Sequence, residues 1–178
     1  MFLMSTASTK PLATPALTCD ELLRHNEGET AKWRDFFDTY PETLGLPAEF
    51  AQMHEVRGVL LHIFAVELIY AERIAGIARP RLDYADFPSG SLDELFGNHD
   101  KAMEHLRGFL ARGAAADWDA VIKFETKTSG TLQGSKRKCF VHLFLHSVRH
   151  WAQLATFLRE SGFKQEWGHD FIFSNVIP

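Results

Sequence analysis

The spacing of apolar and polar positions predicts four long helices. The first runs over 18–40. Thr18 and Glu21 have the spacing of a capping box, in which a hydroxyl and a carboxylate three residues later bond each other's backbone N–H groups. Pro41 should end this helix, because the residue before a proline is biased away from the helical conformation.

The second predicted helix runs from Pro47 to about Ile77. Proline is well placed in a first helical turn, where its missing N–H would have no partner anyway. The sequence GVLLHIFAVELIYAERIAG in this segment is apolar on almost every side. A helix of that kind belongs at the centre of a helical protein.

A second capping box, at Ser91 and Glu94, begins the third predicted helix, which should end near Arg112, before Gly113. Ser135 should cap a fourth helix over 136–161, ended by Gly162.

The connecting segments carry weaker signals. We expect a short helix from Ala114 to about Val121, and an extended or irregular stretch over 122–130, where apolar and polar residues alternate. The tail, 163–178, should be extended and packed over the helices. Residues 1–17 are predicted to be a flexible leader. The remaining 18–178 then form one all-α domain, a four-helix bundle with long connections.

Composition narrows the class of protein. The chain has 178 residues, of which 46% are hydrophobic, enough for one domain with a sizeable core. A net charge of -4 gives no overall attraction to nucleic acid or to anionic membranes. The sequence has no apolar run long enough to span a membrane and no signal-peptide pattern at its start. We therefore expect a cytoplasmic protein that binds neither nucleic acid nor membrane.

The two cysteines, Cys19 and Cys139, are not arranged as a Cys-x-x-Cys pair. A disulfide framework or a thiolate zinc site is therefore not expected. Both are predicted to be small buried side chains.

Three of the nine histidines recur every four residues in the fourth predicted helix: His142, His146 and His150. Residues four apart share one helix face, so neighbouring members can bind one ion. His142 and His150 are about 12 Å apart along the axis, too far for a shared ion. Helical rotation places the pair His146–His150 beside the apolar face and His142 further outward.

His62 lies in the middle of the most apolar predicted helix. A buried imidazole needs a polar partner. One interpretation is a core histidine bonded to a backbone carbonyl or to Glu67. The other is a third metal ligand that meets His146 and His150. The residues alone leave both interpretations open.

Other kinds of site are poorly supported. His54-Glu55 lacks the second histidine of a His-Glu-x-x-His zinc motif. A di-iron bundle needs two Glu-x-x-His motifs, and only Glu166 and His169 have that spacing. Ser147 is not in a Gly-x-Ser-x-Gly nucleophile motif.

At these histidines the sequence resembles the DinB/YfiT family of helical, metal-dependent proteins. The run HLFLHSVRHWAQL at 142–154 is similar to that family's fourth helix, with a His-x-x-x-His pair followed by a small residue, Gln and Leu. His62, followed by Glu67 and Glu72, resembles its second helix, and DFIF at 170–173 resembles its tail. The resemblance covers about 19–173.

The resemblance implies one divalent metal held by His62, His146 and His150. Three neutral imidazoles suit transition metals better than Ca or Mg. Zn or Ni are the first candidates, with Fe, Mn or Cu as others. Three protein ligands leave an open coordination position, which is typical of catalytic sites.

The family includes transferases that use low-molecular-weight thiols such as mycothiol and bacillithiol. The resemblance thus implies a thiol S-transferase, or an isomerase or hydrolase, acting on a small electrophile. The alternative is a non-catalytic, stress-related protein that binds metal or ligand in the same pocket. Family members are often homodimers, and the resemblance implies a homodimer here.

The sequence departs from the family beside the last ligand. Many relatives have a second histidine just before it and Arg-Gly just after it, where this chain has Arg149, Trp151 and Ala152. Any shared role of those neighbouring positions is therefore open.

Further side chains are candidates for supporting roles. Phe64, Tyr70 or Trp151 could line an electrophile pocket, although each ring fits a core position as well. Glu67 or Gln153 could orient a ligand histidine. The basic run of Lys136, Arg137 and Lys138 is either a solvated helix face or a surface that recognises a carboxylated thiol.

Overall fold

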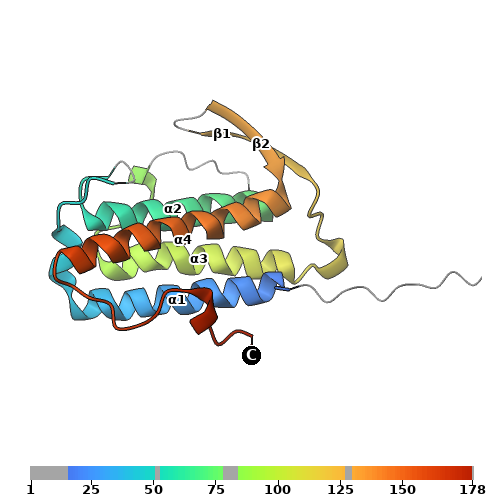
Figure 1. The fold of residues 1–178 in the computed structure, drawn as a ribbon. Helices are drawn as coiled ribbons and strands as arrows, with labels where there is room; N and C mark the ends of the chain where they lie inside the picture. Colours follow the sequence, from blue (N-terminus) through green and yellow to red (C-terminus); the bar gives the residue numbers. More distant parts are fainter. Residues whose placement is uncertain (1–15, 51–52, 78–83, 127–129, 178) are drawn as a thin grey trace, which may run out of the picture.

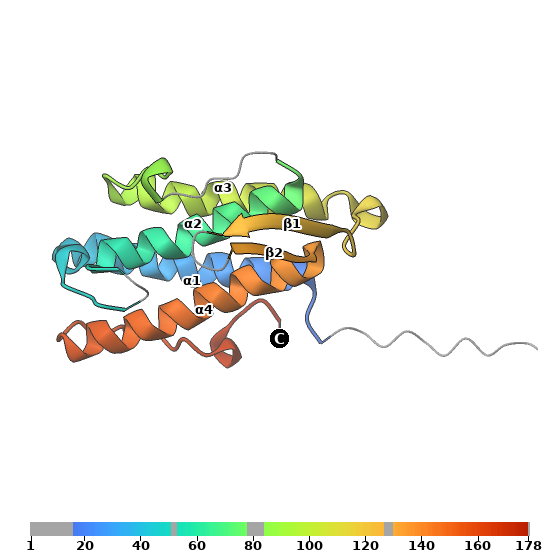
Figure 2. The same cartoon turned by 90° about the horizontal axis from the view of Figure 1, so that it is seen from above.

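A computed structural model describes residues 16–50, 53–77, 84–126 and 130–177. In these residues four long helices run side by side (Figures 1 and 2) and a small antiparallel sheet lies at one end. The helices are α1 (Cys19–Thr39), α2 (Val56–Ala75), α3 (Leu92–Leu110) and α4 (Lys136–Glu160), and the strands are β1 (Val121–Thr126) and β2 (Gly130–Ser135). Short 3₁₀ turns cover Pro41–Gly45, Tyr84–Asp86, Gly113–Ala115 and Phe171–Phe173.

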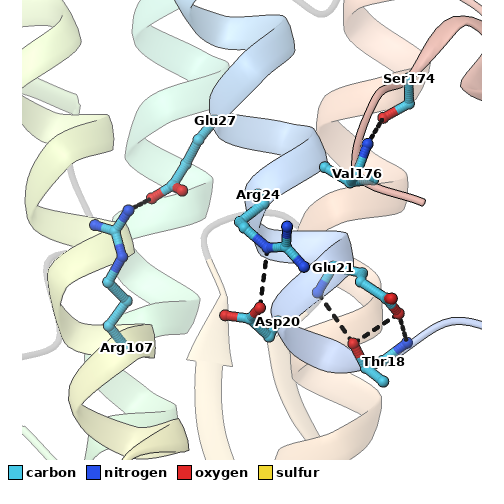
Figure 3. A network of polar contacts seen from close by, with 8 residues as sticks. All are labelled: Thr18, Asp20, Glu21, Arg24, Glu27, Arg107, Ser174 and Val176. Atoms are coloured by element: carbon cyan, nitrogen blue, oxygen red, sulfur yellow. Dashed lines mark hydrogen bonds and ion pairs between the residues drawn. The ribbon is translucent and has the colours of Figure 1, made fainter. Parts of the chain in front are cut away.

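The helix starts follow the predicted caps. Thr18 and Glu21 form the capping box of α1 (Figure 3), and Ser91 and Glu94 form that of α3. The Ser135 hydroxyl accepts from the Lys138 backbone N–H at 3.2 Å and caps α4. Local side-chain bonds of this kind satisfy N–H groups that the helix leaves free, which is why the sequence alone locates them.

The predicted start of the second helix at Pro47 is wrong, because α2 begins at Val56. The residues 46–48 instead pair with 54–56 through their backbones. Ala48 N–H donates to the His54 carbonyl at 3.0 Å, and Val56 N–H donates to that of Leu46 at 3.1 Å. These bonds use groups that a continuous helix would have used internally.

The prediction of an all-α fold is also wrong in one place. The expected short helix at 114–121 is only the 3₁₀ turn, and the following residues form a hairpin in which Phe124 pairs with Leu132. The alternating pattern indicated the extended conformation of β1 but not its partner, β2. The fold is therefore mostly helical with a two-stranded sheet, which lies over α2 and α4 (Figure 2).

Helix α2 is the central element, as its apolar sequence predicts. It packs against both α3 and α4, and α3 packs against α1. Its side chains Leu60, Ile63, Phe64 and Leu68 are fully buried. None of the helices among the described residues is apolar over enough of its length to span a membrane.

The tail after α4 packs back over α1, as expected (Figure 1). The Trp167 indole N–H donates to Glu29 at 3.3 Å, and His25 Nδ1 lies 3.1 Å from the Ser174 hydroxyl. The predicted leader, 1–17, falls outside the described residues except for its last two. Both cysteines are described and free: Cys139 is buried as predicted, whereas Cys19 is exposed.

One carboxylate in the core is bonded to side chains from every other long helix. Glu67 of α2 is fully buried. It accepts from Asn26 Nδ2 of α1 at 3.0 Å, from His99 Nδ1 of α3 at 2.7 Å and from the Ser147 hydroxyl of α4 at 2.6 Å. A buried carboxylate is tolerated only when such donors replace its hydration.

Replacing Glu67 by Leu should lower the free energy of unfolding by about 3–5 kcal/mol, because the buried donors of Asn26 and His99 lose their acceptor and Ser147 keeps only its bond to the Leu143 carbonyl. Urea denaturation measures the change. Glu104→Leu is the matched control, since Glu104 is exposed on α3 and the same substitution there should cost under about 0.5 kcal/mol. Equal effects of the two substitutions would contradict the role given to Glu67.

Candidate metal centre

Three imidazoles from two helices meet between α2 and α4. His62 Nε2 lies 3.1 Å from His146 Nε2 and 3.2 Å from His150 Nε2. The candidate ligand atoms of the three residues all lie within 4.8 Å of one another. Tetrahedral zinc with Zn–N bonds of about 2.1 Å implies nitrogens about 3.4 Å apart. The three histidines could therefore hold one metal ion.

The imidazoles are held in the neutral form that binds metals. Burial is the main cause of the lowered pKa of His62, about 4, and of His146, about 2. Neighbouring imidazoles and Arg149 lower both further. Burial, followed by the charge of Arg149, also lowers the pKa of His150, against a smaller opposing effect of Gln153. A neutral ring has a nitrogen lone pair that can bind a cation.

Two of the rings contact a neighbouring side chain through Nδ1, the nitrogen that points away from the candidate metal position. His150 Nδ1–H donates to Gln153 Oε1 at 2.7 Å, so Nε2 is the nitrogen that carries the lone pair. His62 Nδ1 lies 2.5 Å from the Tyr84 hydroxyl. His146 Nδ1 is buried and has no hydrogen-bond partner within the described part of the chain.

The relative rotation of α2 and α4 is fixed beside the site. Ser147, between the two α4 ligands, bonds Glu67, which lies five residues after His62 on α2. Five residues are about 1.4 helical turns. The Glu67–Ser147 bond therefore joins the two ligand-bearing helices close to where the imidazoles meet.

No fourth His, Cys, Asp or Glu joins the three imidazoles among the residues the structure describes. A site with three protein ligands leaves room for an exogenous ligand. One charged group is in direct contact with the site: Arg149 Nη2 donates to His150 Nε2 at 2.9 Å.

None of the three aromatic residues predicted to line a pocket is shown to contact the metal-ligand atoms. Phe64 and Trp151 are buried core rings, and Trp151 stacks on Trp33 at a centroid distance of 4.9 Å. Tyr70 packs against the exposed ring of His142, with the two ring centroids 4.9 Å apart. His142 faces outward as expected, and its ring centroid is 5.9 Å from that of His146.

Two members of the basic run at the start of α4, Lys136 and Arg137, are bound to acidic residues outside the histidine site. Lys136 forms an ion pair with Asp117 at 2.6 Å, and Arg137 forms one with Asp119. These two cations hold the segment before the hairpin against α4, so their predicted role in ligand recognition is not supported.

Sequence reasoning correctly identified Gln153 as a partner of a ligand histidine. It was wrong for Glu67, which contacts none of the three imidazoles and bonds His99 instead. It missed Tyr84 and the contact that Arg149 makes. Tyr84 comes from the connection before α3, 22 residues from His62, and no local pattern links the two.

The fold and the three imidazoles define a mostly helical protein with a histidine group that could hold a metal ion. The model of the DinB family matches residues 4–173, and the chain therefore belongs to the DinB family. No curated protein matches the sequence.

Replacing His150 by Ala should reduce the metal content of the purified protein from about one ion per chain to nearly none, because two imidazoles rarely retain a transition metal. Elemental analysis after gel filtration measures it. His142→Ala, which removes the exposed histidine of the same helix stripe, should keep the metal. Full metal in the His150 variant would show that the ligand assignment is wrong.

Ser147→Ala should weaken metal affinity by on the order of tenfold, the lower end of the effect of residues that orient metal ligands. A competition titration against a chromogenic chelator measures this affinity. Asn26→Ala is the matched control. It removes a donor to the same carboxylate from α1, which carries no ligand, and should lower stability without changing affinity. If both variants lose affinity equally, the Ser147 contact has no specific effect on the ligands.

Proposed function

We propose that the protein is a metal-dependent enzyme that joins a low-molecular-weight thiol to a small electrophile, or isomerises or hydrolyses such a compound. The observation that supports this most strongly is the convergence of three neutral imidazoles with no fourth protein ligand in the described residues. Structural zinc sites usually have four protein ligands, whereas catalytic sites keep one position open.

The residues of the chain have distinct parts in this proposal. The ion is bound by His62, His146 and His150. Gln153 orients His150 through its Nδ1, and Tyr84 contacts the Nδ1 of His62. A divalent ion bound there would lower the pKa of a thiol or water that reaches it, and so supply a nucleophile at neutral pH. Zn or Ni are the first candidates, with Fe or Mn as others, because imidazole ligands suit these ions.

The same proposal extends to the fold type and to the partners. The four helices with long connections are proposed to be the four-helix bundle of DinB type. The partners are a small electrophile and a thiol rather than nucleic acid or membrane. Pairing of two copies stays a prediction, which sedimentation equilibrium would test.

The experiment is a turnover assay on metal-loaded protein, with a panel of cellular thiols and a chromogenic electrophile such as chlorodinitrobenzene. Turnover should require both thiol and metal, disappear on chelation and return when metal is added back. Replacing His62 by Ala should abolish it, since the ion loses its only ligand from α2.

Metal binding without turnover across the whole panel would instead support the alternative, a non-catalytic protein that binds metal or ligand. Absence of metal binding in the wild-type protein would overturn both functions, because both need the same three ligands.

A further inference from the structure

Arg149 is bonded to a nitrogen that the proposed metal would need. Its Nη2 lies 2.9 Å from His150 Nε2, and a guanidinium can only donate, so it occupies the lone pair of that nitrogen. The same Nε2 lies 3.2 Å from His62 Nε2. A metal ion and Arg149 therefore compete for His150.

The surroundings of the site contain positive charge and no bonded carboxylate. The side chains that hold the rings are Gln153, a neutral amide, and Tyr84, whose phenol pKa is raised by burial. Burial is the main cause of the lowered pKa of the three imidazoles and of His142, and the positive charge of Arg149 lowers each of these pKa values further. None of the carboxylates in the described ranges hydrogen-bonds to one of the three imidazoles.

A divalent ion in this site would bring the local charge to plus three: two charges from the ion and one from Arg149. The imidazoles are neutral and compensate none of it. Like charges repel, although water screens part of this repulsion at the exposed Arg149. A ligand with negative charge is therefore favoured in this site. A thiolate bound to the ion supplies only one negative charge. The guanidinium of Arg149 can then bind a second anionic group.

Arg149 is also free to take such a group. It is exposed, and it has no ion-pair partner within the part of the chain that the structure describes. Two other basic residues of α4, Lys136 and Arg137 near its start, are by contrast already paired, with Asp117 and Asp119. A planar guanidinium binds a carboxylate through two parallel hydrogen bonds, which makes this pairing specific.

We propose that the site takes a small thiol or electrophile that carries a carboxylate, and that Arg149 leaves His150 when metal enters and binds this carboxylate. The proposal rests on metal binding by the three histidines. It gives one side chain two opposite effects, since Arg149 should weaken the binding of metal and strengthen the binding of the carboxylated ligand.

The first measurement is metal affinity, by competition of zinc against a chromogenic chelator. Arg149→Gln should raise the affinity about tenfold, because the repelling charge is removed and a shorter, neutral amide replaces the guanidinium that competes for His150. Arg159→Gln removes the same charge ten residues further along α4, about 15 Å away, and should leave affinity unchanged. General damage to the fold cannot raise metal affinity. Unchanged or lower affinity in Arg149→Gln would overturn the proposal.

The second measurement uses cobalt(II)-loaded protein, in which the absorption of a bound thiolate reports binding. Mercaptopropionate and mercaptopropanol are compared, because they differ in the carboxylate. Any chelation of the ion by the carboxylate itself contributes equally in wild type and variant. The preference for mercaptopropionate should fall about tenfold in Arg149→Gln and less in Arg149→Lys, which keeps the charge but not the two-bond geometry.

The outcomes separate this proposal from the function on which it rests. If wild-type protein binds neither zinc nor cobalt, nor any of the other candidate ions, the proposed metal-dependent function fails. If it binds both ions and the preference for mercaptopropionate is the same in wild type and Arg149→Gln, only the role of Arg149 is overturned.

Discussion

The arrangement of the helices depends on a single buried carboxylate. Glu67 lies on the central helix and accepts hydrogen bonds from Asn26, His99 and Ser147, one from each of the other three long helices. Apolar packing tolerates small rotations and shifts, because many arrangements bury similar area. A buried carboxylate does not tolerate them, since each lost donor leaves an unsatisfied charge in a medium of low dielectric constant. Glu67 therefore gives the packed helices one defined set of rotations.

The meeting of the three histidines depends on these helix rotations. His62 can meet His146 and His150 only if α2 and α4 face each other at one rotation, and the Glu67–Ser147 bond lies beside the place where they meet. Burial then keeps the imidazoles neutral, with the pKa of His62 near 4. Burial disfavours the charged form of each imidazole, and the neutral form is the one that can bind a metal ion. The positively charged Arg149 contacts this group through His150.

Local patterns in the sequence predicted the parts that depend on local interactions. The caps at Thr18, Ser91 and Ser135 involve residues at most three apart, and α1 and α4 begin where these caps predict. The predicted start of α2 was wrong because the Val56 N–H donates to the Leu46 carbonyl. This contact joins residues ten apart, and local helix propensity does not reveal it. The sheet was missed because pairing of β1 with β2 is a contact between segments, which alternation within one segment does not reveal.

The sequence by itself determined that His146 and His150 share a helix face, since a four-residue spacing acts through helix geometry alone. It also indicated that His62 is enclosed by apolar residues and needs a partner. Only the tertiary structure decided which partner that is. The contacts of His62 with the α4 histidines span 84 and 88 residues, and that of His99 with Glu67 spans 32. Such contacts depend on how whole helices pack, and periodicity describes one helix at a time.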